Sequence, residues 1–171
     1  MLLPLLIAFI VLGIDQATKH WIRTNLAYGQ SWAIIPALDG WLNITYIHNS
    51  GAAFGILPQA NLLFIIIAVI VVVVIVVYYL YLPPGGFLVR ASLGLQLGGA
   101  LGNLLDRLRY GYVTDFVDIG LSPSLRWSTF NVADACIVIG VCILAYHLLF
   151  VWPDRAADER ITKTTHERAG Q

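Results

Sequence analysis

The sequence predicts a mostly α-helical membrane protein with four transmembrane helices and a small β element outside the membrane. Of its 171 residues, 58% are hydrophobic and only 12% are charged, and the mean hydropathy is +0.77. Soluble domains average about 25% charged residues, so this chain has roughly half the charge that a water-exposed surface needs. Four apolar stretches, each long enough to cross a bilayer, alternate with polar connections. One connection contains the β-branched and aromatic residues of a strand.

The four predicted spans carry almost no charge. The second is the clearest, because it is almost entirely Leu, Ile, Val and Ala, and its 22 residues, rising about 1.5 Å each, cross the roughly 30 Å hydrocarbon core. The first has no basic start and no small-residue cleavage site, so we interpret it as an uncleaved helix and not as a signal peptide. Pro83-Pro84-Gly85-Gly86 predicts a tight turn before the third. The spans are residues 2–22, 61–82, 87–105 and 132–152.

An even number of spans places both termini on one side of the membrane. The long connections, residues 24–60 and 106–131, therefore share the other side. Within the first connection, Trp41–Ile47 predicts a strand at the membrane surface. Lys and Arg residues near the span ends are equally numerous on both sides, so the positive-inside rule gives no orientation. We predict one membrane domain, residues 1–152, and a flexible polar tail, residues 153–171.

Charge and cysteine content exclude several classes of protein. Ten basic and ten acidic residues give a net charge of zero, so no global field attracts nucleic acid. Cys136 and Cys142 lie in one apolar run, which predicts buried free thiols and neither a disulfide framework nor a zinc site. The four histidines have no ligand spacing to one another or to the acids, so we expect no metal and no cofactor.

Ionisable groups at membrane depth are costly unless they are paired or face a wet cavity, so each is a functional candidate. Asp15 and Lys19 are four residues apart with the acid first, the favourable order for an ion pair within a helix. Such a pair either serves a site or only fixes the depth of the helix. Asn103 and Arg107 share one face at the far end of the third span, and Arg107 either contributes to a site or anchors the span at the interface.

Asp115 and Asp134 form the most informative pair of acids. Asp134 lies 18 residues before Trp152, about 27 Å along a helix, so the two residues mark opposite interfaces. The third span ends at the same face as Asp134, and we expect a loop there to carry Asp115. Asn131 precedes Asp134 by three residues and can share its helical face. The two carboxylates can therefore converge in one site, and the alternative is two unrelated interfacial acids.

Two adjacent aspartates support aspartic proteolysis. Ionising both carboxylates at close range is energetically unfavourable, so one of them keeps its proton. The ionised carboxylate can then activate water, while the protonated one polarises a peptide carbonyl. Serine and cysteine mechanisms lack a neighbouring His, and the cysteines lie mid-helix. A small proton-coupled transporter and a non-catalytic membrane assembly factor are the competing functions. A transporter should place its acids near the midplane, often with repeat symmetry that this sequence lacks.

Glycines recur every four residues along the third span, at Gly94, Gly98 and Gly102. Such a ridge of small residues lets another helix approach closely. We expect it to hold the helix carrying Asn103 tightly against a neighbour, as a preorganised site requires.

The sequence resembles the lipoprotein signal peptidases, also called signal peptidase II. Five motifs occur in the family's order over residues 15 to 134, without departure from the family pattern. They are Asp15-Gln16-Ala17-Thr18-Lys19, Asn49-Ser50-Gly51-Ala52-Ala53-Phe54-Gly55, Gly98-Gly99-Ala100-Leu101-Gly102-Asn103-Leu104-Leu105-Asp106-Arg107, Gly111-Tyr112-Val113-Thr114-Asp115-Phe116-Val117-Asp118 and Phe130-Asn131-Val132-Ala133-Asp134.

The resemblance implies an aspartic endopeptidase that removes the signal peptide of a diacylglyceryl-modified prolipoprotein by cleaving just before the lipidated cysteine. By the same resemblance, Asp115 and Asp134 are the catalytic residues. Supporting and substrate-binding roles fall on Asp15, Lys19, Asn49, Gly51, Asn103, Arg107 and Asn131.

The resemblance also implies an orientation and a location. It indicates a multi-pass protein of the bacterial inner membrane with cytoplasmic termini and the dyad at the periplasmic, outer leaflet. The expected partners are the lipidated prolipoprotein and membrane lipids, without nucleic acid, and the expected state is a monomer. Acyl chains would fix the scissile bond at the membrane surface where the dyad lies.

Overall fold

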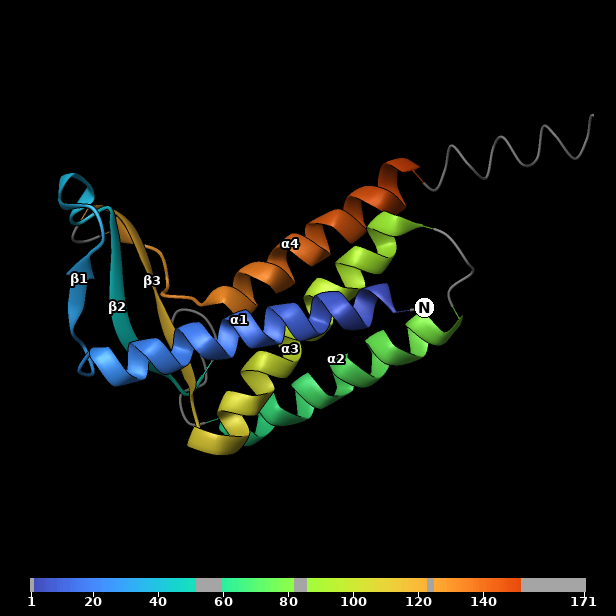
Figure 1. Cartoon of the computed structure of the whole chain (residues 1–171), viewed down its shortest axis with the longest axis horizontal. Coiled ribbons are helices and arrows are strands. Elements are labelled where there is room, and N and C mark those ends of the chain that lie inside the picture. The colour runs from blue at the N-terminus through green and yellow to red at the C-terminus, as the bar shows by residue number, and fades with distance from the viewer. Residues whose placement is uncertain (1, 52–59, 82–85, 123–124, 152–171) are drawn as a thin grey trace, which may run out of the picture.

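Four helices lie alongside one another and a small sheet sits at one end of them in the computed structural model (Figure 1). The structure describes residues 2–51, 60–81, 86–122 and 125–151. The predicted turn at 83–86 falls largely outside these ranges, as do most of the second motif and the predicted tail. The helices are α1 (Leu3–Asn25), α2 (Asn61–Tyr81), α3 (Phe87–Tyr110) and α4 (Val132–Tyr146), which continues as a π-helical turn (His147–Val151).

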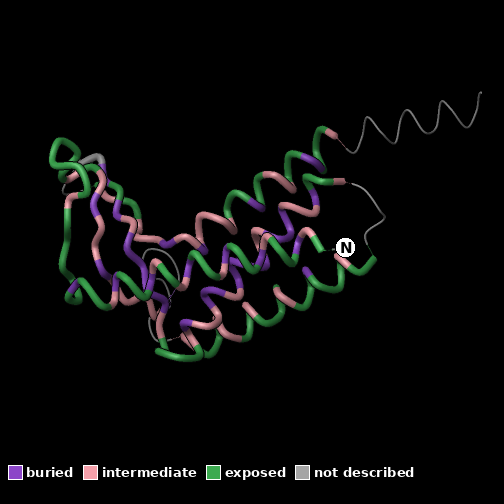
Figure 2. The backbone as a smooth tube through the Cα atoms, in the orientation of Figure 1, coloured by how far each residue is buried: buried purple, intermediate pink, exposed green. Residues whose placement is uncertain are grey.

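Within the described residues, three helices are long and apolar enough to cross a membrane: Leu3–Asn25, Asn61–Tyr81 and Val132–Val151. The helix predicted as the third span, α3, is not among them, because its glycines and polar residues lower its hydropathy. It packs instead against all three of the others, and Figure 2 shows buried positions along it. The protein is thus a mostly helical membrane-type fold organised around α3.

Two predicted boundaries differ from the structure. The first helix continues to Asn25 instead of ending at residue 22. The third continues to Tyr110 instead of ending at residue 105, so Asp106 and Arg107 lie on the helix and not in the following connection. Helix α3 ends at Gly111, whose φ of 78° is left-handed and suits glycine, and whose N–H bonds to the carbonyl of Arg107.

The sheet is antiparallel, with strand order β1-β2-β3-β4. The predicted strand at Trp41–Ile47 is confirmed as β2, but the other strands were not predicted. Asp115 lies on β3, so the expectation that a loop carries it is wrong. The hydrogen-bonded partner β2 makes this segment extended, pairing Asp115 with Ile47. The strands are β1 (Ser31–Ala33), β2 (Leu42–Asn49), β3 (Val113–Ser122) and β4 (Leu125–Arg126).

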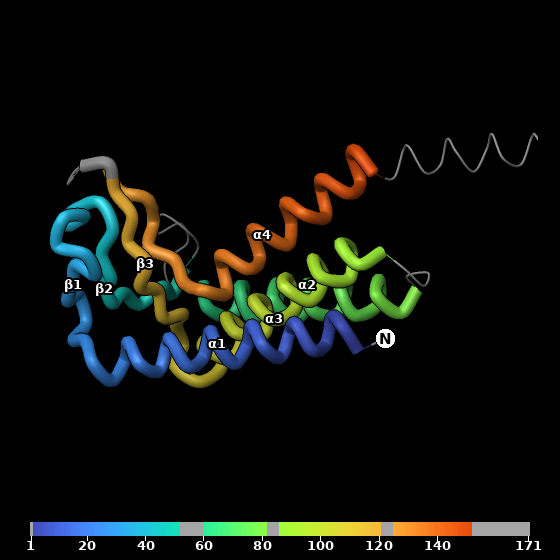
Figure 3. Tube along the Cα trace, turned by 45° about the horizontal axis from the view of Figure 1, so that its top comes forward, coloured from blue at the N-terminus to red at the C-terminus, as the bar shows by residue number. Residues whose placement is uncertain are grey.

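Small residues and a hydrophobic cluster fix α1 against its neighbours. The predicted glycine ridge is confirmed, because added Cβ atoms at Gly94 and Gly98 would lie 2.7–2.8 Å from α1 backbone oxygens. Gly99 packs as closely against α4. At the far end, Ile22 and Phe116 belong to a buried cluster that joins α1 to the sheet. As a result α1, α3 and the start of α4 meet beside β3, as the turned view in Figure 3 also shows.

Candidate active site

Asp115 and Asp134 come from different elements and are joined by one residue, Asn131. The side-chain Nδ2 of Asn131 donates to Oδ1 of Asp115 at 2.6 Å. Its backbone N–H donates to Oδ2 of Asp134 at 3.2 Å, and its Oδ1 accepts from the backbone N–H of Asp134 at 3.0 Å. These last two bonds form a capping box that starts α4. The expected convergence of the two acids is therefore present in the fold.

Asp115 is almost fully enclosed, with 1% of its surface exposed. Its second oxygen, Oδ2, accepts a hydrogen bond from Nδ2 of Asn49 at 2.8 Å. Asn49 ends β2, and the β2–β3 pairing brings it to this position. Burial, together with the negative charge of Asp134, raises the pKa of Asp115 to about 7, against the hydrogen bonds from Asn49 and Asn131 that lower it. Asp115 therefore holds its proton well above the pH at which an exposed aspartate loses it.

Asp134 is half-buried and faces a cavity. Its Oδ1 accepts a 2.7 Å hydrogen bond from Nδ2 of Asn103 on α3. Asp134 also lies in the first turn of α4, where the positive end of the helix dipole favours an anion. The Oδ1 of Asn103 in turn accepts from Nζ of Lys19 at 2.8 Å, which fixes the amide with its NH₂ toward Asp134.

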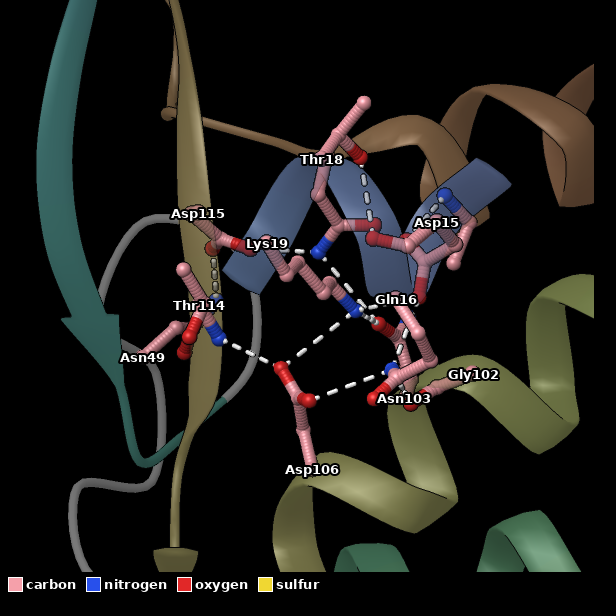
Figure 4. A network of polar contacts seen from close by, with 12 residues as sticks. Asp15, Gln16, Thr18, Lys19, Asn49, Gly102, Asn103, Asp106, Thr114 and Asp115 are labelled. Carbon is pink, nitrogen blue, oxygen red and sulfur yellow. Dashed lines mark hydrogen bonds and ion pairs between the residues drawn. The ribbon is translucent and has the colours of Figure 1, made fainter. Parts of the chain in front are cut away.

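A buried ion cluster lies beneath these residues (Figure 4). Lys19 and Asp15 form the predicted ion pair at 2.9 Å, and neither side chain is exposed. Lys19 also lies 3.4 Å from Asp106, and the Oδ1 of Asp15 accepts from the backbone N–H of Ala133 in the first turn of α4 at 3.0 Å. The cluster is buried inside the protein and bonds to other elements, so it does more than fix the depth of α1. It ties α1 to the turn that carries Asp134.

Asp106, Thr114 and Arg23 contact this cluster and were not among the predicted site residues. Asp106 lies in the third of the five motifs, and its Oδ2 accepts a hydrogen bond from the backbone N–H of Thr114, next to Asp115, at 3.0 Å. Arg23 bonds to Oγ1 of Thr114 at 2.9 Å and lies 3.4 Å from Asp106. In the sequence, Arg23 is only one of the basic residues near a span end. Its role depends on contacts with residues more than 80 positions away, which no local spacing reveals.

A cavity of about 580 Å³ opens beside Asp134. Gly51 and Arg107 lie in its wall, and Nη2 of Arg107 donates to the carbonyl of Gly51 at 3.4 Å. The guanidinium of Arg107 also lies over the ring of Phe64, 5.2 Å from its centroid. Much of the remaining wall is apolar. The lining residues are Asn49, Gly51, Arg107, Trp127, Ser128, Thr129, Phe130, Asp134, Ala135, Val138 and Ile139.

The nine predicted site residues thus lie in two connected groups. Seven are joined through polar contacts around the two acids, namely Asp15, Lys19, Asn49, Asn103, Asp115, Asn131 and Asp134. Gly51 and Arg107 complete the cavity wall. Among the described residues, no three His, Cys, Asp or Glu side chains gather in a way that could hold a metal ion.

Comparison with known proteins identifies the family. The profile described as "Signal peptidase (SPase) II" matches residues 7–150. The chain belongs to the signal peptidase II family. Members of this family are aspartic peptidases, so the competing transporter and assembly-factor functions are not supported.

Curated relatives and solved structures agree with this membership. The "Lipoprotein signal peptidase" of Moorella thermoacetica is 48% identical over 145 residues, covering 85% of this chain and 91% of that one. Its counterpart in Pelotomaculum thermopropionicum is 42% identical over 144 residues, covering 84% and 90%. A solved structure titled "Bacterial membrane enzyme structure by the in meso method at 2.3 A resolution" is 35% identical with a TM-score of 0.77, covering 85% of this chain and 87% of that chain.

Proposed function

We propose that this signal peptidase II removes the signal peptide of diacylglyceryl-modified prolipoproteins, cleaving just before the lipidated cysteine, with Asp115 and Asp134 as the catalytic dyad. The observation that carries the proposal is that Asn131 bonds to both carboxylates beside a cavity. Two acids held by one residue, one of them buried and one facing the cavity, can share a single proton near neutral pH.

The environments of the two acids support a division of roles. Asp134 faces the cavity at a helix N-terminus, so it is the carboxylate that removes a proton from water. Asp115 is the protonated partner that donates to the carbonyl oxygen of the scissile peptide as the water oxygen bonds to its carbon. When the C–N bond breaks, the amine takes the proton held by Asp134, and Asp115 regains its own from the intermediate's hydroxyl.

The cavity wall supports a lipidated, extended peptide as substrate. Asn49, Gly51 and Arg107 offer polar groups to a peptide backbone. Val138 and Ile139 on α4 present an apolar wall that suits hydrocarbon chains. Acyl chains held in the bilayer would keep the adjacent peptide bond at the dyad. The reacting groups would then not have to meet by free diffusion.

We propose a four-span topology for the protein in the bacterial inner membrane, with α3 as the buried additional span. In this arrangement both termini are cytoplasmic and the sheet with the dyad lies at the outer leaflet. The 24 residues of α3 are sufficient to cross the hydrocarbon core, and its packing against three neighbours shields its polar groups from lipid. A C-terminal reporter that is active only in the periplasm should stay inactive, and an active reporter would contradict this topology.

The decisive experiment is cleavage of a lipidated precursor by purified variants, followed by gel shift. Asp115→Asn and Asp134→Asn should each lower cleavage about a thousandfold or more, because each removes one half of the proton exchange. Asp118→Asn is the matched control, since Asp118 lies on the same strand but pairs with Arg126 at 2.8 Å. Near wild-type cleavage by either dyad variant would overturn the assignment, and it is also what an assembly factor would show.

A further inference from the structure

A second cavity lies at the end of the helices opposite the sheet. It has a volume of about 260 Å³ and is bounded by α1, α2 and α3, with side chains that are almost all aliphatic. Leu5 of α1 and Ile75 of α2 contribute to opposite walls, and Leu93 and Leu97 of α3 lie between them. We call this cavity the apolar crevice. Neither acid of the dyad lines it, so it is a separate feature of the fold.

The crevice exists because α1 and α2 both pack on α3, side by side rather than mainly on one another. Figures 1 and 3 show the start of α1 and the end of α2 at the same end of the bundle. Both helices are among those long and apolar enough to cross a membrane. A cavity of aliphatic walls gives water no hydrogen-bond partners. In a bilayer, the occupant that fits such walls is a hydrocarbon chain.

A basic residue, Arg90, contacts one of the residues that line the crevice. The guanidinium of Arg90 stands over the ring of Tyr79, with its Cζ 5.6 Å from the ring centroid. Tyr79 itself lines the crevice. Arg90 precedes Leu93 by three residues and Leu97 by seven, so all three lie on one face of α3. The crevice is therefore apolar along its length and cationic at its end.

The position of Arg90 suits a phosphate group. It is the fourth residue of α3, where its own backbone N–H bonds to the carbonyl of Gly86 and the nearby N-terminal end of the helix dipole favours an anion. Guanidinium groups have five donors and can bind phosphate oxygens in pairs while keeping other contacts. The tyrosines at the end of α2, Tyr78, Tyr79 and Tyr81, are of the residue type that lies at headgroup level.

We propose that the apolar crevice binds one chain of an anionic phospholipid, whose headgroup is held by Arg90, in the leaflet opposite the sheet. The bound lipid contacts α1, α2 and α3 together. Because α1 carries the Asp15–Lys19 pair toward the dyad, the lipid stabilises the helix on which that ion cluster depends. The proposal does not rest on the peptidase mechanism, since the two cavities share no lining residue.

Binding of phosphatidylglycerol and of phosphatidylcholine with identical chains tests the proposal, using the purified full chain in detergent and native mass spectrometry. Wild type should bind phosphatidylglycerol more tightly. Arg90→Gln should weaken that binding about fivefold, as expected for one basic residue near an anionic lipid, and should weaken phosphatidylcholine binding less, because the choline cation offsets the phosphate charge. Arg109→Gln is the matched control, because Arg109 is an exposed arginine near the opposite end of α3.

A second pair of variants tests the crevice itself. Leu5→Trp should fill the crevice and reduce binding of both lipids, and since Leu5 is 53% exposed the change does not disturb a packed core. Leu6→Trp is the control, because Leu6 is equally exposed, at 56%, but does not line the crevice. Thermal unfolding without added lipid shows whether each variant is folded. Equal binding of the two lipids to wild type, or unchanged binding to Leu5→Trp, would overturn the proposal.

Discussion

The side-chain amide of Asn131 donates a 2.6 Å hydrogen bond to Oδ1 of Asp115, across 16 positions of the sequence. The same residue is the N-cap of α4, where it exchanges two hydrogen bonds with Asp134. Its side chain is completely buried. Asn131 therefore combines two tasks that are usually separate, because it both begins a helix and sets the relative position of two carboxylates.

Asn131→Ser should separate these two tasks. Serine is also a favourable N-cap, so the part of the free energy of unfolding that comes from the cap should change by less than about 1 kcal/mol. Serine cannot reach Asp115 with an amide donor, so kcat for cleavage of a lipidated precursor should fall by about tenfold or more. Thermal unfolding and the cleavage rate are measured together. A kcat that stays near the wild-type value would show that the bond from the side-chain amide of Asn131 to Asp115 does not contribute to cleavage.

The pH dependence of cleavage should report Asp115. Its pKa is raised to about 7, so it is protonated below that pH, and kcat/KM should fall as the pH rises through about 7. The hydrogen bond from Asn49 favours the ionised form, so Asn49→Ala should raise the pKa and move the midpoint to higher pH.

Asn43→Ala is the control for this shift. Asn43 lies on the same strand as Asn49 but bonds to residues of the β1–β2 region, away from the dyad. The midpoint of the pH profile of Asn43→Ala should match that of the wild type. A midpoint that does not move in Asn49→Ala, or that moves to lower pH, would contradict the protonated role of Asp115.

Lys19→Met should destabilise the protein strongly. The change leaves the buried carboxylates of Asp15 and Asp106 without the ammonium between them, and breaking a buried ion pair costs about 3–5 kcal/mol. It also removes the shorter of two hydrogen bonds to Oδ1 of Asn103, so the amide that contacts Asp134 is held less firmly and cleavage should fall in the folded fraction. Urea unfolding is the measurement, with Arg109→Met as an exposed-charge control. A loss below about 1 kcal/mol would show that the cluster contributes little.

Gly99→Ala should lower stability because there is no room for the methyl group. A Cβ there would lie 2.5 Å from the backbone oxygen of Ala133, so α3 and α4 would have to separate, at a cost of about 1–3 kcal/mol. Gly13→Ala is the control on α1, since no atom lies within 4 Å of its added Cβ. That variant should be unchanged or slightly more stable, because alanine favours the helix. Equal thermal unfolding midpoints for Gly99→Ala and Gly13→Ala would show that the close approach of α3 and α4 at Gly99 does not contribute to stability.

Cleavage should be insensitive to chelators, because the proposed mechanism places both proton transfers on carboxylates. Preincubation with EDTA should leave the rate of cleavage within the error of the untreated enzyme. Loss of activity that zinc restores would refute the carboxylate mechanism.

Much of the fold and of the candidate site can be predicted from the sequence. The low charge content predicts a membrane protein, and the apolar runs locate its helices, because bilayer thickness and helix rise set their lengths. Spacing alone predicts the Asp15–Lys19 pair, since residues four apart lie on one helical face. The family motifs point to Asp115 and Asp134. Trp41–Ile47 predicts β2, because its β-branched and aromatic composition is a local signal.

Only the tertiary structure decides how these residues work together. It places Asp115 on β3, because pairing with β2 depends on a strand more than 60 residues earlier. It brings Arg23 and Asp106 into one buried cluster and turns the amide of Asn103 toward Asp134. These contacts join distant segments whose burial cannot be read from local spacing. The sequence by itself determined that the protein belongs in a membrane, where most of its helices lie and which two acids are the candidates for the dyad. Long-range packing decided the environments of these acids and hence the raised pKa of Asp115.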